Sequence, residues 1–167
     1  MSKYEELVNL YHHTRLNFNQ YEDECSTFSR DLVTGFLEYV GWPREQEINY
    51  LAVGQEIDPD NKFYALAGAM EMDTESFWHF GVELRLQESN GAYPLSLVLT
   101  FFIKKSDTDF IVKLGPKGRE IKIPTSKRGQ LEPFFEVVYR QMHEFLTLHY
   151  MQAITGNQTE FGFITLI

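Results

Sequence analysis

The sequence predicts an α+β fold in which an antiparallel sheet is flanked by helices, and three observations predict it. Apolar residues recur at helical spacing in residues 1–41 and again in residues 130–153. Between them, residues 47–124 alternate apolar and polar side chains and are divided by turn sequences. A long helix with one apolar stripe needs a sheet face on which to pack. We therefore expect a single domain over residues 1–167, with the C-terminal amphipathic helix packed on the sheet.

The N-terminal 41 residues predict a helical hairpin. Ser2 and Glu5 have the spacing of a capping box, which marks a helix start. Asn19 and Glu22 repeat that spacing and predict the start of a second helix. Gly41 follows the last apolar residue of the pattern and predicts the helix end.

The central segment predicts a meander of about six strands. Turn residues separate its alternating runs, so that neighbouring runs form hairpins and the sheet is antiparallel. The first hairpin is expected to turn at residues 58–61, where the sequence reads Asp-Pro-Asp-Asn. The expected strands are 47–57, 62–72, 77–88, 93–104, 109–114 and 119–124.

The C-terminal segment predicts one long helix over residues 130–153, with Pro133 in its first turn, where a missing N–H is harmless. Residues 161–167 are short and apolar, which is compatible with one more strand. This element order resembles that of helix-grip proteins, in which a curved meander wraps a C-terminal helix. The usual first strand before the helices is absent here, and the resemblance implies a fold without assigning any functional residue.

One face of the predicted sheet carries small and apolar side chains that water alone would not cover. We expect the N-terminal helices, a second subunit or a partner to cover it. The sequence-based hypothesis is a homodimer or higher oligomer that uses this face, through Ala65, Ala67, Ala69, Val98 and Phe102.

Composition excludes several classes of protein. A chain of 167 residues with 43% hydrophobic residues can bury a full core without metals or disulfides, and its single cysteine cannot form an internal bridge. The first ten residues are charged and amphipathic, unlike a signal peptide, and no apolar run reaches the roughly 20 residues of a membrane helix. We therefore expect a cytoplasmic protein that does not enter a membrane.

Charge is unevenly distributed along this acidic chain. The net charge is −9, yet residues 104–128 hold eight basic and three acidic residues. This excess predicts a docking surface for an acidic or anionic partner. The alternatives are lysines that protect a sheet edge, or charges neutralised by the chain's own acids. The sequence pI of about 5.0 argues against nucleic acid as that partner. The candidate residues are Lys113, Lys117, Arg119, Lys122, Lys127 and Arg128.

Catalytic, metal and cofactor motifs are not found in the sequence. His143 and His149 lie six residues apart, so they point about 120° away from each other on a helix and cannot share one ion. The sequence contains no nucleophile elbow and no glycine-rich phosphate loop. We therefore expect no metal and no cofactor, and the absence of these motifs favours a binding protein over an enzyme.

Two functional hypotheses remain open from the sequence. The first is a non-catalytic binding protein, similar to a small acidic adaptor or chaperone, that self-associates and docks a partner through a sheet face or the basic hairpin. The second is a carrier or pocket enzyme that holds an apolar ligand between the sheet and the C-terminal helix. The polar groups expected in that pocket are Tyr50, Tyr64, Trp78 and His149.

Overall fold

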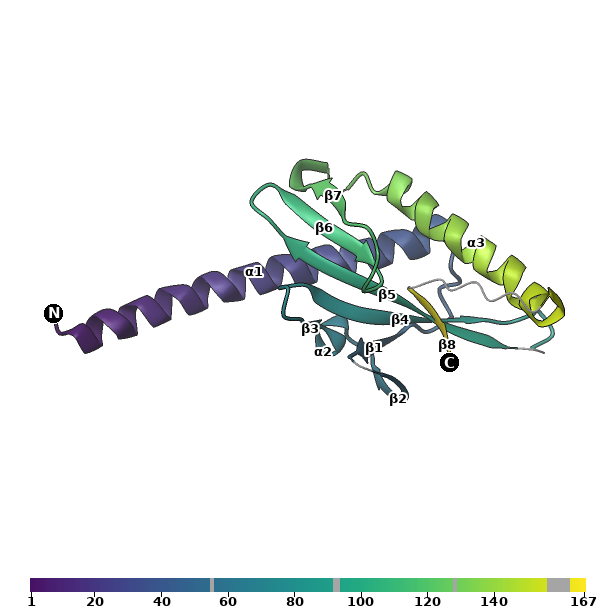
Figure 1. Cartoon of the computed structure of the whole chain (residues 1–167), viewed down its shortest axis with the longest axis horizontal. Helices are drawn as coiled ribbons and strands as arrows, with labels where there is room; N and C mark the ends of the chain where they lie inside the picture. Colours follow the sequence, from purple (N-terminus) through teal and green to yellow (C-terminus); the bar gives the residue numbers. More distant parts are fainter. Residues whose placement is uncertain (55, 92–93, 128, 156–162) are drawn as a thin grey trace.

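The computed structural model shows an α+β protein in which an antiparallel sheet is flanked by a long N-terminal and a C-terminal helix (Figure 1). It describes residues 1–54, 56–91, 94–127, 129–155 and 163–167, and for residues 149–155 only the backbone. The elements are α1 (Lys3–Val40), β1 (Asn49–Val53), β2 (Ile57–Phe63), α2 (Leu66–Ala69), β3 (Glu71–Met72), β4 (Trp78–Leu86), β5 (Leu95–Lys105), β6 (Asp109–Leu114), β7 (Ile121–Pro124), the 3-10 turn η1 (Thr125–Lys127), α3 (Glu132–Thr155) and β8 (Ile164–Leu166).

The described sheet has eight strands in the order β2-β1-β4-β5-β6-β7, with β3 paired to β4 and β8 paired to β5. Every pairing is antiparallel. The longest register joins β4 to β5, from Trp78 opposite Ile103 to Leu86 opposite Leu95. The predicted meander is therefore confirmed from β4 to β7, and β7 lies at one edge of the sheet.

The N-terminal segment forms one helix of 38 residues instead of the predicted pair. The capping box at Ser2 and Glu5 is present, with the Glu5 amide donating to the Ser2 hydroxyl at 3.2 Å. The second predicted start, at Asn19, lies inside the helix, because neither glycine nor proline interrupts residues 3–34 and the helical spacing continues through it. The predicted end is correct, since Gly41 adopts a left-handed φ of 69°.

The first hairpin turns earlier in the chain than predicted. Tyr50 pairs with Phe63 and Val53 pairs with Ile57, so the Asp-Pro-Asp-Asn sequence lies within β2 and not at its tip. Pro59 is tolerated there because β2 is an edge strand, where a missing N–H need not break a ladder. The predicted strand 62–72 is instead divided among the end of β2, the single-turn helix α2 and β3.

Both long helices pack on the same face of the sheet. Phe28 of α1 stacks on Phe110 of β6 with ring centroids 4.0 Å apart, and Phe36 lies 6.0 Å from Phe135 of α3. The Tyr39 hydroxyl also donates to a carboxylate of α3. This core cluster includes Phe28, Leu32, Val33 and Phe36 of α1, Phe134, Phe135, Val138, Met142 and Phe145 of α3, and Phe80, Val82, Leu84, Leu97, Leu99, Phe101, Ile103, Phe110 and Val112 of the sheet.

The opposite face of the sheet, here called the outer face, is covered by the chain's own side chains. Val98 is fully buried with Leu51 and Val53, and Phe102 is buried with Phe77 and Ile111. The predicted alternation of outward residues on β4 and β5 is present in the register. The helices that were expected as one cover of this face lie on the other one.

The single cysteine lies in the buried part of α1. Cys25 is 0% exposed, and burial raises the pKa of its thiol from 9.0 to about 11. At pH 8 the thiol is therefore almost entirely neutral, and the reactive thiolate is rare.

We expect native Cys25 to react with a chromogenic disulfide reagent at pH 8 more than about 100-fold more slowly than the same chain in urea, because both burial and the raised pKa oppose reaction. Stopped-flow absorbance measures both rates. Equal rates in the two states would show that this part of α1 is not packed on the sheet.

Candidate binding groove at the edge of the sheet

The six basic residues predicted from the sequence do not all lie on one surface. Arg119, Lys122 and Lys127 are exposed and line one groove. Lys117 is exposed in the loop between β6 and β7 but does not line it. Arg128 lies outside the described residues. Three of the six candidate residues therefore share one groove, and their role in docking a partner stays a prediction.

Lys113 lies apart from that groove on the outer face and is buried. Its ammonium stands 4.3 Å from the centre of the Phe77 ring and 3.8 Å from a carboxylate oxygen of Glu75. These contacts stabilise its charge within the chain. Lys113 is consequently unsuited to docking a partner.

The groove lies between the β7 edge of the sheet and the first half of α3, and we call it the β7–α3 groove. Its volume is about 670 Å³. Much of its apolar surface comes from Leu131 just before α3, from Phe134 and Val137 of α3, and from Ile121 and Ile123 of β7. The remaining lining residues are Leu114, Gly118, Arg119, Lys122, Pro124, Lys127, Gln130, Pro133 and Gln141.

Local sequence explains why this part of the core stays open. Leu131, Phe134 and Val137 recur every three residues; the first two belong to the core cluster, and half-buried Val137 extends this apolar surface toward the edge of the sheet. The turn before β7 is tight, because a Cβ at Gly118 would lie 2.3 Å from the Leu114 carbonyl oxygen. The short strand β7 follows this turn and is the last strand on its side of the described sheet. No further described strand therefore covers the space beside α3.

The electrostatics of the β7–α3 groove are one-sided. Among the described residues that line it, three are basic and none is acidic. The three cations are exposed at its rim, whereas Ile123, Leu131 and Phe134 are buried. An apolar floor with a basic rim suits a ligand that combines apolar and anionic groups.

The three pocket residues of the second hypothesis whose side chains are described do not line one cavity. Tyr64 is 85% exposed, whereas Trp78 is buried, and its indole nitrogen has no hydrogen-bond partner among the described residues. Tyr50 is half-buried on the core side of β1. His149 belongs to α3, and its side chain lies outside the described ones.

A second groove, of about 400 Å³, lies between the end of α1, the end of β4 and α3. Trp42 and Leu86 contribute to its apolar surface, and His143 lines it from α3. Its position under the C-terminal helix matches the location that the second hypothesis expects for a ligand.

The residues predicted as an oligomer face do not form one exposed surface. Ala65 and Ala67 are exposed near or in α2, which is a helical turn and not a strand. Ala69, Val98 and Phe102 are buried within the chain. A homodimer would therefore need a different surface, because buried residues cannot contact a second copy without rearrangement.

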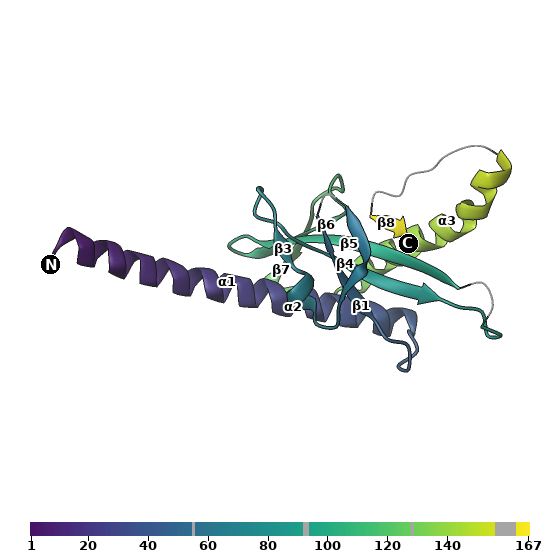
Figure 2. The ribbon, with the colours of Figure 1, turned by 90° about the horizontal axis from the view of Figure 1, so that it is seen from below.

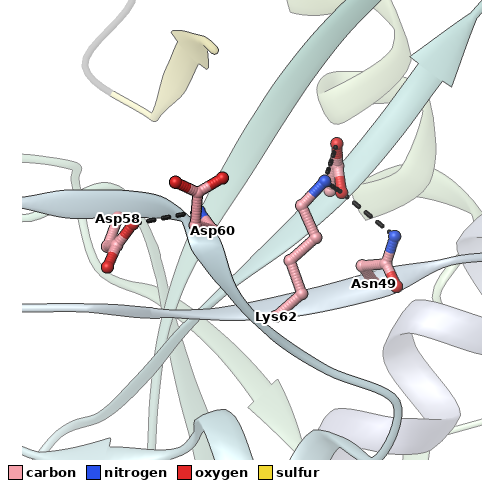
Figure 3. Close-up of polar contacts among 5 residues, drawn as sticks. Asn49, Asp58, Asp60 and Lys62 are labelled. Carbon is pink, nitrogen blue, oxygen red and sulfur yellow. Dashed lines mark hydrogen bonds and ion pairs between the residues drawn. The ribbon is translucent and has the colours of Figure 1, made fainter.

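A polar cluster on the outer face joins β1, β2 and β4 (Figure 3). The Glu83 carboxylate is 6% exposed, and it accepts hydrogen bonds from the Lys62 ammonium at 3.0 Å and the Asn49 amide at 3.1 Å. Asp58 accepts from the Asp60 amide at 2.9 Å in the neighbouring part of β2. The cluster neutralises a buried carboxylate and fixes the first hairpin against β4.

We expect Lys62→Met to lower the free energy of unfolding by about 1–2 kcal/mol, because the buried Glu83 would lose its cation while water reaches part of the gap. Urea denaturation followed by circular dichroism measures the loss. Adding Glu83→Gln to Lys62→Met should recover part of it, since the amide carries no charge. A double variant less stable than the single one would contradict this role.

Groups of three or more residues able to hold a metal ion are absent from the described part of the chain. In the same residues, none of the helices is long and apolar enough to cross a membrane. Comparisons with protein-family models, curated proteins and solved structures gave no match.

The apolar lining of the β7–α3 groove is the feature that sequence reasoning missed. The helical spacing of residues 130–153 predicts one apolar stripe for the core, which includes Leu131 and Phe134, and gives no separate sign of a groove beside it. The available signal was the juxtaposition of a basic segment with apolar residues spaced three apart at the start of that helix.

Proposed function

We propose that this chain is a non-catalytic binding protein that docks an acidic, amphipathic segment of another protein in the β7–α3 groove. The observation that carries the proposal is the combination of an apolar floor with a rim of Arg119, Lys122 and Lys127 and no acidic lining residue among those described. A segment with a few apolar side chains and flanking carboxylates complements both features.

The energetics favour a modest, salt-sensitive affinity. Burying two or three apolar side chains contributes about 2 kcal/mol each, and ordering the segment opposes part of that gain. The rim cations are exposed, so they accelerate association more than they add affinity. We expect a weak dissociation constant, between about 30 μM and 1 mM, which corresponds to about −4 to −6 kcal/mol.

Selection from a library of displayed random peptides of about 14 residues tests the proposal directly, because a helix of that length, about 21 Å, exceeds the roughly 12 Å of α3 between Pro133 and Gln141 that lines the groove. We expect enriched peptides to carry apolar residues on one face and net negative charge. These enriched peptides should not bind a Lys122→Glu/Val137→Asp variant, since this variant changes both the rim and the floor.

Neutral or basic peptides that bind wild type and this variant equally would contradict the proposal. An Arg44→Glu/Asn61→Asp protein has the same net charge as this variant and serves as the control, because both residues are exposed and neither lines the β7–α3 groove. This control should bind the enriched peptides as wild type does.

A second candidate function is transport of a small apolar ligand with an anionic group. The volume of about 670 Å³ favours it, because small-molecule pockets occupy roughly 300–1,000 Å³. Native mass spectrometry of protein purified from its own host separates the two. A retained small molecule that Val137→Asp releases would favour the ligand carrier over the docking protein.

A further inference from the structure

The N-terminal part of α1 projects away from the rest of the molecule (Figures 1 and 2). We call residues 3–17 the arm; at 1.5 Å per residue it is about 22 Å long. All of its residues are exposed. Phe18 and Tyr21 are the first residues of α1 with a described ring contact or hydrogen bond to the rest of the molecule, here called the body. The Phe18 ring lies 6.3 Å from that of Trp78, and the Tyr21 hydroxyl donates to the Ser76 carbonyl. The body therefore leaves the arm uncovered.

The arm carries the same apolar stripe that packs on the sheet farther along α1. Large apolar residues recur every seven positions at Tyr4, Tyr11, Phe18, Cys25 and Leu32. The last two are 0% exposed, whereas Tyr4 is 75%, Tyr11 65% and Phe18 44% exposed. A seven-residue repeat keeps one helix face toward one partner, so the buried face of α1 continues along the arm without a cover.

The exposed area of this stripe is large enough for a dimer contact. At roughly 200 Å² for each fully exposed aromatic side chain, Tyr4, Tyr11 and Phe18 of two copies together expose roughly 700 Å². Leu7, 64% exposed, and Val8, 45% exposed, lie on the same face and bring the total toward the roughly 1,000 Å² of a specific interface. Patches of this size on a monomer mark interaction sites.

We propose that the arms of two copies of this chain pair with each other in antiparallel orientation and form a homodimer. Within the arm, Lys3 and Arg15 balance Glu5 and Glu6, so two arms do not repel although the whole chain carries −9. This surface is separate from the β7–α3 groove, and the inference does not rest on the proposed function.

Charge favours the antiparallel orientation over the parallel one. In the antiparallel pair, the N-terminal end of the arm, with Lys3 and the positive end of the helix dipole, lies beside Glu22 and Asp23 of the second copy. A parallel pair would instead place these carboxylates beside their own equivalents. With Tyr11 at the two-fold axis, Tyr4 lies beside Phe18 of the second copy, which extends the stripe to the edge of its body.

Sedimentation equilibrium at tens of micromolar protein tests the pairing. We expect wild type to have twice the 19.6 kDa mass of the chain, and Leu7→Glu/Tyr11→Glu to have the mass of one chain. The matched control is Leu16→Glu, because Leu16 is 48% exposed but lies about 140° from Tyr11 around the helix. Leu16→Glu should remain dimeric, and circular dichroism should show all three proteins folded.

Orientation is tested by disulfide cross-linking of a mixture of Leu7→Cys and Arg15→Cys proteins. These positions face each other in the antiparallel pair, so the mixture should cross-link more efficiently than either protein alone. Cross-linking of Leu7→Cys chiefly with itself would overturn the orientation. A monomeric wild type would overturn the inference, even if its arm were found to bind phosphatidylcholine vesicles or another protein through Leu7 and Tyr11. A dimer that survives Leu7→Glu/Tyr11→Glu would overturn it as well.

Discussion

Replacing Phe28 with alanine is expected to lower the free energy of unfolding by about 3–5 kcal/mol. Phe28 is 0% exposed, and its ring stacks on that of Phe110 with planes 3° apart. The substitution removes the side chain that joins α1 to β6 and leaves a cavity that neither element can close alone. Urea denaturation at fixed protein concentration measures the change.

Leu16→Ala is the control for this experiment, because Leu16 lies on the same helix but is 48% exposed. It should change stability by no more than about 0.5 kcal/mol. A loss below about 1.5 kcal/mol for Phe28→Ala would contradict the packing of α1 against the sheet, since a fully buried aromatic residue costs more than that.

Val137→Asp is expected to weaken peptide binding in the β7–α3 groove by at least about 30-fold, near 2 kcal/mol, because a carboxylate would be buried against the apolar floor. Val137 is half-buried, so the side chain can be changed without disrupting the core. Fluorescence anisotropy of a labelled selected peptide gives the dissociation constant.

The rim should behave differently from the floor. Lys122→Glu is expected to lower the association rate and to weaken the dependence of that rate on salt, because exposed charges act mainly at long range and the Debye length is about 8 Å at 0.15 M salt. An Arg44→Glu protein has the same net charge and should keep the wild-type rate. Equal slowing by both substitutions would show that total charge, and not the rim, steers the peptide.

The sequence predicted the fold class well where local and global signals agree. The bounds of β6 were predicted without error, and α3 was predicted within two residues, because alternation, turn residues and helical spacing all favour the same elements there. The helix end at Gly41 was also predicted correctly, since a residue with a left-handed φ is usually glycine.

Predictions failed where a local signal had two interpretations. Asn19 and Glu22 have capping-box spacing, but a cap forms only where the chain enters the helix from extended backbone, and here the helix is already formed. The residues Asp58 to Asn61 are typical of a turn, yet the pairing places the connection between Val53 and Ile57, where Gly54 lies. Cross-strand pairing decides such cases, and one sequence does not reveal it.

The candidate site was only partly predictable for the same reason. Charge excess identified Arg119, Lys122 and Lys127, because net charge is a property of the sequence itself. The β7–α3 groove depends on how far α3 lies from the edge of the sheet, and this distance follows from the packing of α1 beside α3. The exposure of the arm likewise requires knowledge of where the sheet ends.

Hydrogen exchange with a selected acidic peptide bound is the most direct test of a docking groove at this edge. The amides of residues 121–123, 131–132 and 134–141 should exchange more slowly in the complex, because the peptide covers the edge strand β7 and the first turns of α3. The arm and the outer face should exchange as in the free protein. Protection confined to the arm or to the outer face, with residues 121–123, 131–132 and 134–141 unchanged, would contradict the proposed function.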